Sequence, residues 1–151
     1  MAQRADMPRR GTTVLIFKLP LDGAETTLHT FSGKDGSCPQ GLMQATNGKF
    51  YGTTQSGGTD GNGEVFVLDV GLGPFVKTVL TSGSAGARVT ILGTDLTGAI
   101  GVSFNGTAAT FKITSATSIV ASVPDGATSG TVTVTTPTGT LTSNIAFTVL
   151  P

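Results

Sequence analysis

Residues after position 74 alternate between apolar and hydroxyl-bearing side chains in runs of about six, and this alternation limits the fold more than any other feature. Successive side chains of a strand point to opposite faces, so each run has one buried and one solvated face. The apolar members are Val89 and Ile91, Val102 and Phe104, Phe111 and Ile113, Ile119, Ala121 and Val123, Val132 and Val134, and Ile145, Phe147 and Val149. Helical 3.6-residue periodicity never lasts beyond a turn, so the predicted class is all-β.

Turn residues divide these runs at even spacing. Asn105-Gly106 is suited to a two-residue hairpin turn, and we expect Phe111 and Ile113 on the strand that returns from it. Residues 145–149 are expected to form the last strand. Each strand supplies only two or three apolar side chains, each stabilising by about 1.5–3 kcal/mol when fully buried. One sheet cannot close a core from so few, so two facing sheets, an immunoglobulin-like β-sandwich, are predicted.

The same segment carries an ordered set of motifs. It opens with Gly86-Ala87-Arg88-Val89-Thr90-Ile91-Leu92-Gly93-Thr94-Asp95-Leu96 and continues with residues 102–106, 123–127 and 132–137. Ser143-Asn144 followed by Phe147-Thr148-Val149 completes the set. The segment from about Phe75 to Val149 resembles the IPT/TIG domain, which implies an immunoglobulin-like fold.

The first half of the chain has a different texture, with clustered glycines, and Gly71-Leu72-Gly73-Pro74 is a plausible linker between the halves. Residues 14–19 and 64–69 share a Phe-x-Leu core, in which Phe17 and Phe66 lie 49 positions apart. A spacing near 50 residues is typical of one β-propeller blade or of a comparable repeat. We therefore expect about one propeller-like repeat unit before the sandwich.

Further motifs lie between the two Phe-x-Leu segments. They are Thr27-Leu28-His29-Thr30-Phe31-Ser32-Gly33, Gly41-Leu42-Met43, Lys49-Phe50-Tyr51-Gly52-Thr53-Thr54 and Gly57-Gly58. Residues 14–69 resemble the bacterial GloVer repeat. That resemblance implies a tandem, propeller-like array in a secreted or surface-associated bacterial protein, with neighbouring repeats or another protein surface as partners.

The predicted domains are a disordered or clipped tail over residues 1–13, a GloVer-like repeat of antiparallel, blade-like β-structure over 14–73, and the IPT/TIG sandwich over 74–151. A blade buries its faces against neighbouring blades. Either the chain is the C-terminal piece of a longer protein, or the unit docks on the sandwich or on another chain. Residues 14–19 are too short for a signal-peptide core, and no apolar run approaches the roughly 18 residues of a membrane span.

Charge argues against nucleic acid as a partner. Nine basic residues balance nine acidic ones, only 12% of residues are charged, and no run of like charges occurs. Phosphate backbones require a clustered basic face. Some sandwiches of this family bind DNA, but from Pro74 onward the chain carries a net charge of only +1.

No catalytic residue is assigned. His29 is the only histidine, and we expect a structural role for it, with a backbone or threonine partner; a general base paired with a carboxylate is the alternative. Ser32 and Ser82 precede glycines without a nucleophile elbow or a second histidine. Asp95 and Asp125 fall in separate predicted loops. Cys38, beside Pro39, is expected to be an incidental loop residue because no basic neighbour would lower its pKa.

No metal or cofactor site is assigned either. Thr59-Asp60-Gly61-Asn62-Gly63-Glu64 offers alternating oxygen ligands, but it has too few carboxylates for a calcium loop and runs directly into a strand. Gly71-Leu72-Gly73 lacks the strand-then-helix context of a phosphate-binding loop.

The sequence therefore predicts a non-catalytic structural or interaction module, with the sandwich as a spacer or cap. A carbohydrate- or other ligand-binding module is the alternative. The absence of Trp and the single Tyr51, which lies inside a repeat motif, disfavour a polysaccharide site, since such sites use aromatic platforms. DNA binding is the third and least favoured reading.

Overall fold

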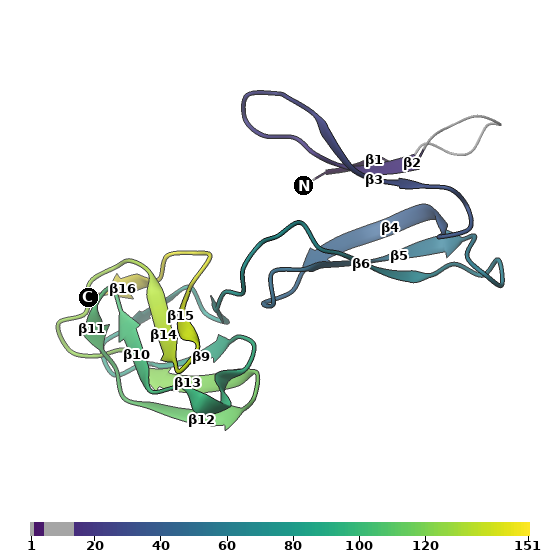
Figure 1. Ribbon diagram of the computed structural model, residues 1–151. Helices are drawn as coiled ribbons and strands as arrows, with labels where there is room; N and C mark the ends of the chain where they lie inside the picture. The colour runs from purple at the N-terminus through teal and green to yellow at the C-terminus, as the bar shows by residue number, and fades with distance from the viewer. Residues whose placement is uncertain (1, 5–13) are drawn as a thin grey trace. The chain divides into compact units, whose positions relative to one another are not determined.

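A computed structural model describes residues 2–4 and 14–151, and its secondary structure is almost entirely strand (Figure 1). The chain divides into two compact units. The first comprises Met1–Ala45 and Lys49–Leu72, and the second comprises Thr46–Gly48 and Gly73–Pro151. The all-β class predicted from the apolar alternation is confirmed; among the described residues the one helical element is a three-residue 3₁₀ turn, η1 (Leu96–Gly98).

The second unit is built on two four-stranded sheets. One sheet has the order β11-β10-β14-β15, with β11 Thr107–Ala108, β10 Gly101–Phe104, β14 Val132–Thr136 and β15 Gly139–Thr142. The other has the order β12-β13-β9-β7, with β12 Phe111–Ser115, β13 Ser118–Ser122, β9 Arg88–Leu92 and β7 Lys77–Thr78. These sheets fit the predicted immunoglobulin-like sandwich.

The sandwich core follows from the strand registers. Val102 and Phe104 of β10 lie opposite Val134 and Val132 of β14, and all four are buried. Val89 and Ile91 of β9 lie opposite Ala121 and Ile119 of β13 and are likewise buried. The intervening hydroxyl residues form the other face, where Ser103 and Thr133 share a 2.7 Å hydrogen bond between their side-chain oxygens. Period-two alternation therefore separates core from surface on both sheets.

The strand returning from the Asn105-Gly106 turn differs from the prediction. The turn forms as expected, with positive φ at both residues, but the return strand β11 is only two residues long. The chain then leaves this sheet, and Phe111 and Ile113 pair with Ala121 and Ile119 in the opposite one. Apolar alternation cannot show this change of sheet because it marks an inward face without saying which sheet supplies it.

The predicted last strand is wrong in its first part. Only Thr148–Leu150 forms a strand, β16, which pairs in parallel with β8 (Ser82–Ser84). Ile145 is 49% exposed, whereas Phe147 is buried. The buried Ser143 hydroxyl donates to the Ile145 carbonyl at 2.8 Å and accepts from the Val132 N–H at 3.0 Å, so this segment forms a bend.

The first unit consists of two three-stranded antiparallel sheets. One has the order β1-β2-β3, with β1 Ala2–Arg4, β2 Val14–Lys18 and β3 Thr26–Phe31. The other has the order β4-β5-β6, with β4 Ser37–Gln44, β5 Phe50–Ser56 and β6 Val65–Leu68. The two sheets lie one over the other (Figure 1).

A small apolar core joins these two sheets. Val14, Ile16 and Phe31 are buried, and Leu28, Leu42, Phe66 and Leu68 pack against them. The rings of Phe31 and Phe66 meet edge to face with centroids 5.3 Å apart. This core has three buried members, against twelve in the sandwich. Its stabilisation is correspondingly smaller.

Two predictions for the first half concern local structure. Most of the predicted tail over residues 1–13 lies outside the described residues, but Ala2–Arg4 within it form β1. Cys38 lies in strand β4 and has a positive φ of 54°, so its placement in a loop was wrong. It lies between Ser37 and Pro39, which pair with Ser56 and Thr54.

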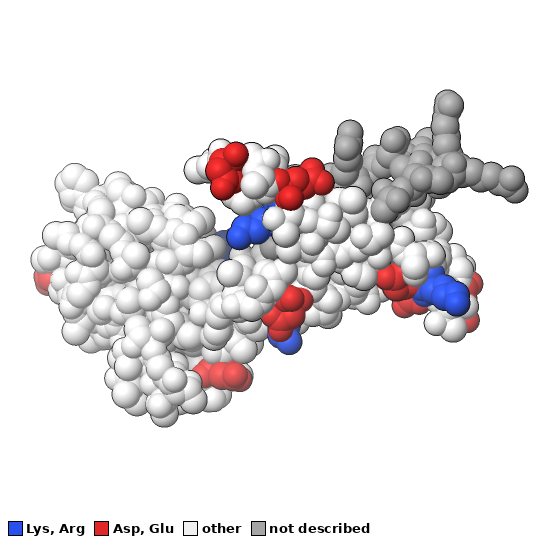
Figure 2. All heavy atoms as spheres, turned by 45° about the horizontal axis from the view of Figure 1, so that its top comes forward, with Lys and Arg blue, Asp and Glu red and all other residues white. Residues whose placement is uncertain are grey.

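Charged side chains are sparse over the surface. On the face drawn in Figure 2, the basic side chains lie in separate spots and form no continuous strip. Lys49 Nζ forms an exposed ion pair with Asp69 Oδ2 at 3.2 Å. The N–H of Gly71, and then Lys49, lower the pKa of Asp69.

Candidate functional site

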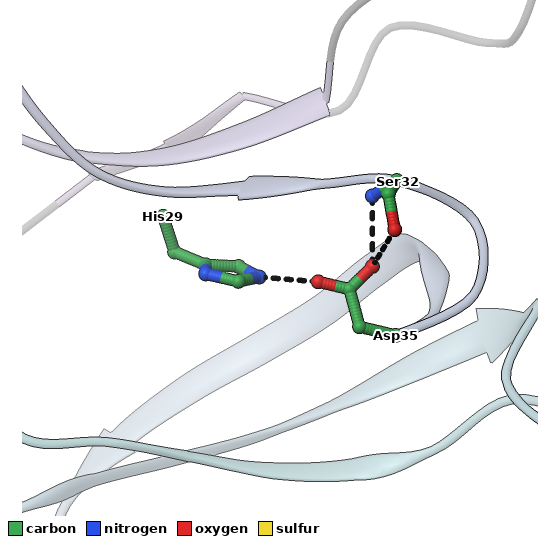
Figure 3. Close-up of polar contacts among 3 residues, drawn as sticks. All are labelled: His29, Ser32 and Asp35. Atoms are coloured by element: carbon green, nitrogen blue, oxygen red, sulfur yellow. Dashed lines mark hydrogen bonds and ion pairs between the residues drawn. The ribbon is translucent and has the colours of Figure 1, made fainter.

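The densest cluster of polar side chains lies where strand β3 ends in a tight turn. His29 projects from β3, and its Nε2 lies 2.8 Å from Asp35 Oδ2 (Figure 3). The other carboxylate oxygen of Asp35 accepts from the Ser32 N–H at 2.7 Å and from the Ser32 hydroxyl at 2.8 Å. The chain can turn this sharply because Gly33 and Gly36 adopt positive φ and bridge to each other.

These contacts stabilise the ionised form of Asp35. The Ser32 N–H, followed by the Ser32 hydroxyl, lowers the pKa of Asp35 to about 2, and His29 contributes in the same direction. A carboxylate that accepts hydrogen bonds from both the backbone and a hydroxyl is held in its charged state. The side chains of His29 and Asp35 are 39% and 41% exposed, so solvent screens their pairing.

The order of these contacts does not match a catalytic triad. The Ser32 hydroxyl donates to Asp35, whereas nucleophile activation requires the hydroxyl to donate to the imidazole. The arrangement instead fixes the turn and orients the His29 ring, which packs edge to face on Phe31 with centroids 4.7 Å apart. The predicted backbone or threonine partner of His29 was wrong, since the partner is Asp35. The sequence feature that could have indicated this partner is the aspartate six residues after His29, beyond Ser32-Gly33.

A small apolar cavity adjoins this cluster. It has a volume of about 140 Å³ and is lined by Ile16, His29, Phe31, Asp35, Phe66, Val67 and Leu68. Strands β2 and β3 supply one wall, and β6 supplies the other. Dry cavities of roughly 150 Å³ accept a group the size of benzene. The cavity therefore has room for one apolar side chain.

The polar groups of the glycine-rich loop before β6 form hydrogen bonds within the loop and to Thr54 of β5. Glu64 Oε1 accepts from the Thr59 N–H at 3.0 Å, and the Glu64 N–H donates to the Thr54 hydroxyl at 2.8 Å. The Gly63 N–H donates to the Gly57 carbonyl at 2.9 Å. Within residues 2–4 and 14–151, no group of three or more His, Cys, Asp or Glu side chains is arranged to hold a metal ion.

The remaining sequence candidates are not members of the His29, Ser32 and Asp35 cluster. Asp95 precedes η1 in a left-handed conformation, Asp125 lies in the turn after Val123, and both are exposed. Ser82 begins β8. Gly71 donates its N–H to Asp69 in a short turn. Each of these residues therefore lies in a turn, beside the short 3₁₀ helix or at the start of a strand.

Together, the two sheets and their shared core define the larger unit as an immunoglobulin-like β-sandwich module. The IPT/TIG domain family matches residues 74–149, which is half of the chain, and the chain belongs to that family. IPT/TIG domains are common non-catalytic interaction modules. None of the curated proteins matches the chain significantly.

The resemblance of residues 14–69 to a GloVer repeat is not identified by these comparisons and stays a prediction. In the part of the chain that the structure describes, no helix has the length and apolar character needed to cross a membrane.

Proposed function

We propose that this chain is a non-catalytic structural and interaction module of a secreted or surface-associated bacterial repeat protein. In this proposal the first unit belongs to a propeller-like array of GloVer type, and the sandwich is its spacer or cap. The partners are neighbouring repeats or another protein surface.

One observation carries the proposal: each of the two Phe-x-Leu segments of the first unit forms a strand that pairs antiparallel with the strand preceding it. Phe17 of β2 lies opposite Ala2 of β1. Phe66 of β6, 49 positions after Phe17, lies opposite Gly52 of β5. The position 49 residues after Ala2 is Tyr51, so the two pairings are of the same kind but differ in register by one residue.

The two Phe-x-Leu strands lie in different sheets of the first unit, β2 in the first and β6 in the second. Each sheet is three-stranded and antiparallel. Propeller blades are four-stranded sheets that stack face to face, as these two sheets do (Figure 1).

An inserted repeat tests the proposal. Leu19 and Leu68 are 49 positions apart, so a duplicate of residues 20–68 placed directly after Leu68 preserves the period. Added neighbouring surface should raise the free energy of unfolding of the first unit by about 2 kcal/mol or more, the value of one buried apolar side chain. Tyr51 is the only tyrosine of the original chain, which has no tryptophan. With Phe in place of the duplicated tyrosine in the insert, urea unfolding followed by Tyr51 fluorescence reports the first unit.

The control is an insert of 49 glycine and serine residues at the same site, which should stabilise nothing. Equal stability of the repeat insert and this control would contradict the array. Micromolar binding of the unmodified chain on a glycan array would favour the ligand-binding alternative.

A further inference from the structure

The small cavity beside strand β3 combines apolar walls with one carboxylate. Three of its lining side chains carry rings, those of His29, Phe31 and Phe66, and the carboxylate belongs to Asp35. All of the lining residues belong to the first unit. Such a lining suits a ligand that is apolar in shape and positively charged.

The three rings are steeply inclined to one another. Phe31 meets His29 at an interplanar angle of 84° with centroids 4.7 Å apart, and it meets Phe66 at 68° with centroids 5.3 Å apart. The face of an aromatic ring carries partial negative charge and attracts a cation within about 6 Å of its centroid. Inclined rings around a small cavity resemble the aromatic cages that hold quaternary ammonium groups.

Asp35 supplies the opposite charge that a cation requires. Hydrogen bonds from the Ser32 N–H and hydroxyl and the contact with His29 Nε2 fix its carboxylate at the cavity (Figure 3). A neutral imidazole can donate this bond from its Nε2–H, which leaves the pair with one negative charge. Among the described residues, no lysine or arginine forms an ion pair with Asp35.

The size of the cavity selects a small group. Its volume of about 140 Å³ is close to the roughly 150 Å³ that accepts benzene, and a trimethylammonium group has fewer non-hydrogen atoms than benzene. A primary ammonium is strongly hydrated, and apolar walls cannot replace the hydrogen bonds that it would lose on entry. The cavity therefore favours a methylated ammonium over a lysine-like one.

We propose that the cavity between β3 and β6 binds a quaternary ammonium group, with the Asp35 carboxylate as its counter-ion and the rings of Phe31 and Phe66 against its methyl groups. The ligand is a small organic cation of the choline type, or the same group at the head of a lipid. Binding uses residues of the first unit only and requires no neighbouring repeat. Because cation–π contacts at partly exposed sites are individually weak, we expect a dissociation constant on the order of 1 mM.

The test compares choline with its neutral carbon analogue, in which a tert-butyl group replaces trimethylammonium. Each is added to the ¹⁵N-labelled full chain at constant ionic strength while the amide resonances of Phe31, Phe66 and Val67 are followed. Choline should bind at least about tenfold more tightly, because only the cation is attracted by Asp35 and by the ring faces. Its methyl proton resonance should move upfield, since ring faces shield the protons above them. A downfield shift would show ring edges toward the ligand and would contradict the cage.

Three variants separate the counter-ion and the rings from a structural effect. Asp35→Asn should weaken choline binding at least about tenfold and leave the affinity for the neutral analogue unchanged, because the cavity stays but the charge is lost. Asp60→Asn is the matched control: it removes the same charge from an exposed loop position outside the lining and should change neither affinity. Phe66→Leu keeps an apolar side chain but removes a ring, and it should weaken choline binding about threefold.

Vesicles distinguish the two sources of the group. Binding to phosphatidylcholine vesicles that free choline displaces would identify a lipid headgroup, whereas binding of free choline without vesicle binding would identify a soluble cation.

Several results would overturn the proposal. They are equal affinities for choline and its neutral analogue, unchanged choline affinity in Asp35→Asn, or amide shifts that leave the cavity lining unaffected. If Asp35→Asn does not fold, Phe66→Leu decides the outcome. Failure of choline to bind leaves the structural role intact, because the inserted repeat tests that role independently.

Discussion

Asp35 shows how a single side chain organises a turn that local sequence only partly predicts. Its carboxylate holds the Ser32 N–H and hydroxyl with one oxygen and His29 with the other. Gly36 is required beside it because a Cβ there would lie 2.6 Å from the Thr54 methyl group, and its φ is +108°. The turn therefore depends on a carboxylate and a glycine acting together.

Because the pKa of Asp35 is lowered in the folded protein, we predict that the first unit loses stability at acid pH. Its folded pKa of about 2 lies below the ordinary 3.8, so its contribution to stability is complete above about pH 4 and is lost as pH falls toward 2. Asp35→Asn should lower the urea midpoint of the Tyr51 transition at pH 6 and flatten its decline between pH 4 and 2. Identical pH profiles for the two proteins would contradict this role.

At the scale of elements, hairpin geometry depends on residues that tolerate positive φ. Asn105 and Gly106 have φ values of 45° and 89°, as expected of a turn in which both central residues are left-handed. The Asn105 side-chain amide also donates to the Thr128 hydroxyl at 2.8 Å, which ties the turn to a neighbouring loop. Asn105 therefore contributes both to the hairpin turn and to the contact with the neighbouring loop.

Gly106→Ala should destabilise the sandwich by about 1–2 kcal/mol, because an L-residue is strained in the left-handed region. Gly101→Ala is the matched control: Gly101 lies in strand β10, and an added Cβ would meet only Thr135 at an ordinary 3.8 Å. It should not destabilise. Urea unfolding followed by circular dichroism distinguishes the two, and equal effects would show that φ is not the cause.

At the scale of the whole molecule, the sandwich contains its own core. The twelve buried residues of its core cluster all lie between Val76 and Phe147. Among the described residues, the core cluster of the first unit has three buried members, and both of its three-stranded sheets end in strands that are paired on one side. Stability is therefore concentrated in the second unit, as expected where burial of apolar surface is the main stabilising term.

Residues 74–151 expressed alone should unfold cooperatively as a folded β-protein. The physical reason is that both sheets and the core between them fall within this segment. Coincident urea transitions by circular dichroism and by one-dimensional NMR would verify a two-state domain. A disordered product would show that the sandwich requires the preceding residues.

Period-two alternation was sufficient to identify much of the sandwich core. Val89 and Ile91, or Val132 and Val134, are buried because a strand with one apolar face has a single way to bury it. The IPT/TIG motifs added the family, which the comparison confirmed. The carboxylate partner of His29 escaped prediction because it lies across a turn whose path is set by two glycines.

The sequence by itself determined the all-β class and much of the buried faces of the sandwich, because these follow from local periodicity and turn chemistry. Tertiary structure alone decided that the chain changes sheets after Ala108, that β16 pairs in parallel with β8, and that β6 ends its sheet unpaired. Those features depend on which strands meet across long separations. Packing of the whole unit selects which distant strands pair with each other. The alternation within one strand shows which face is buried, but it does not show which strand lies beside it.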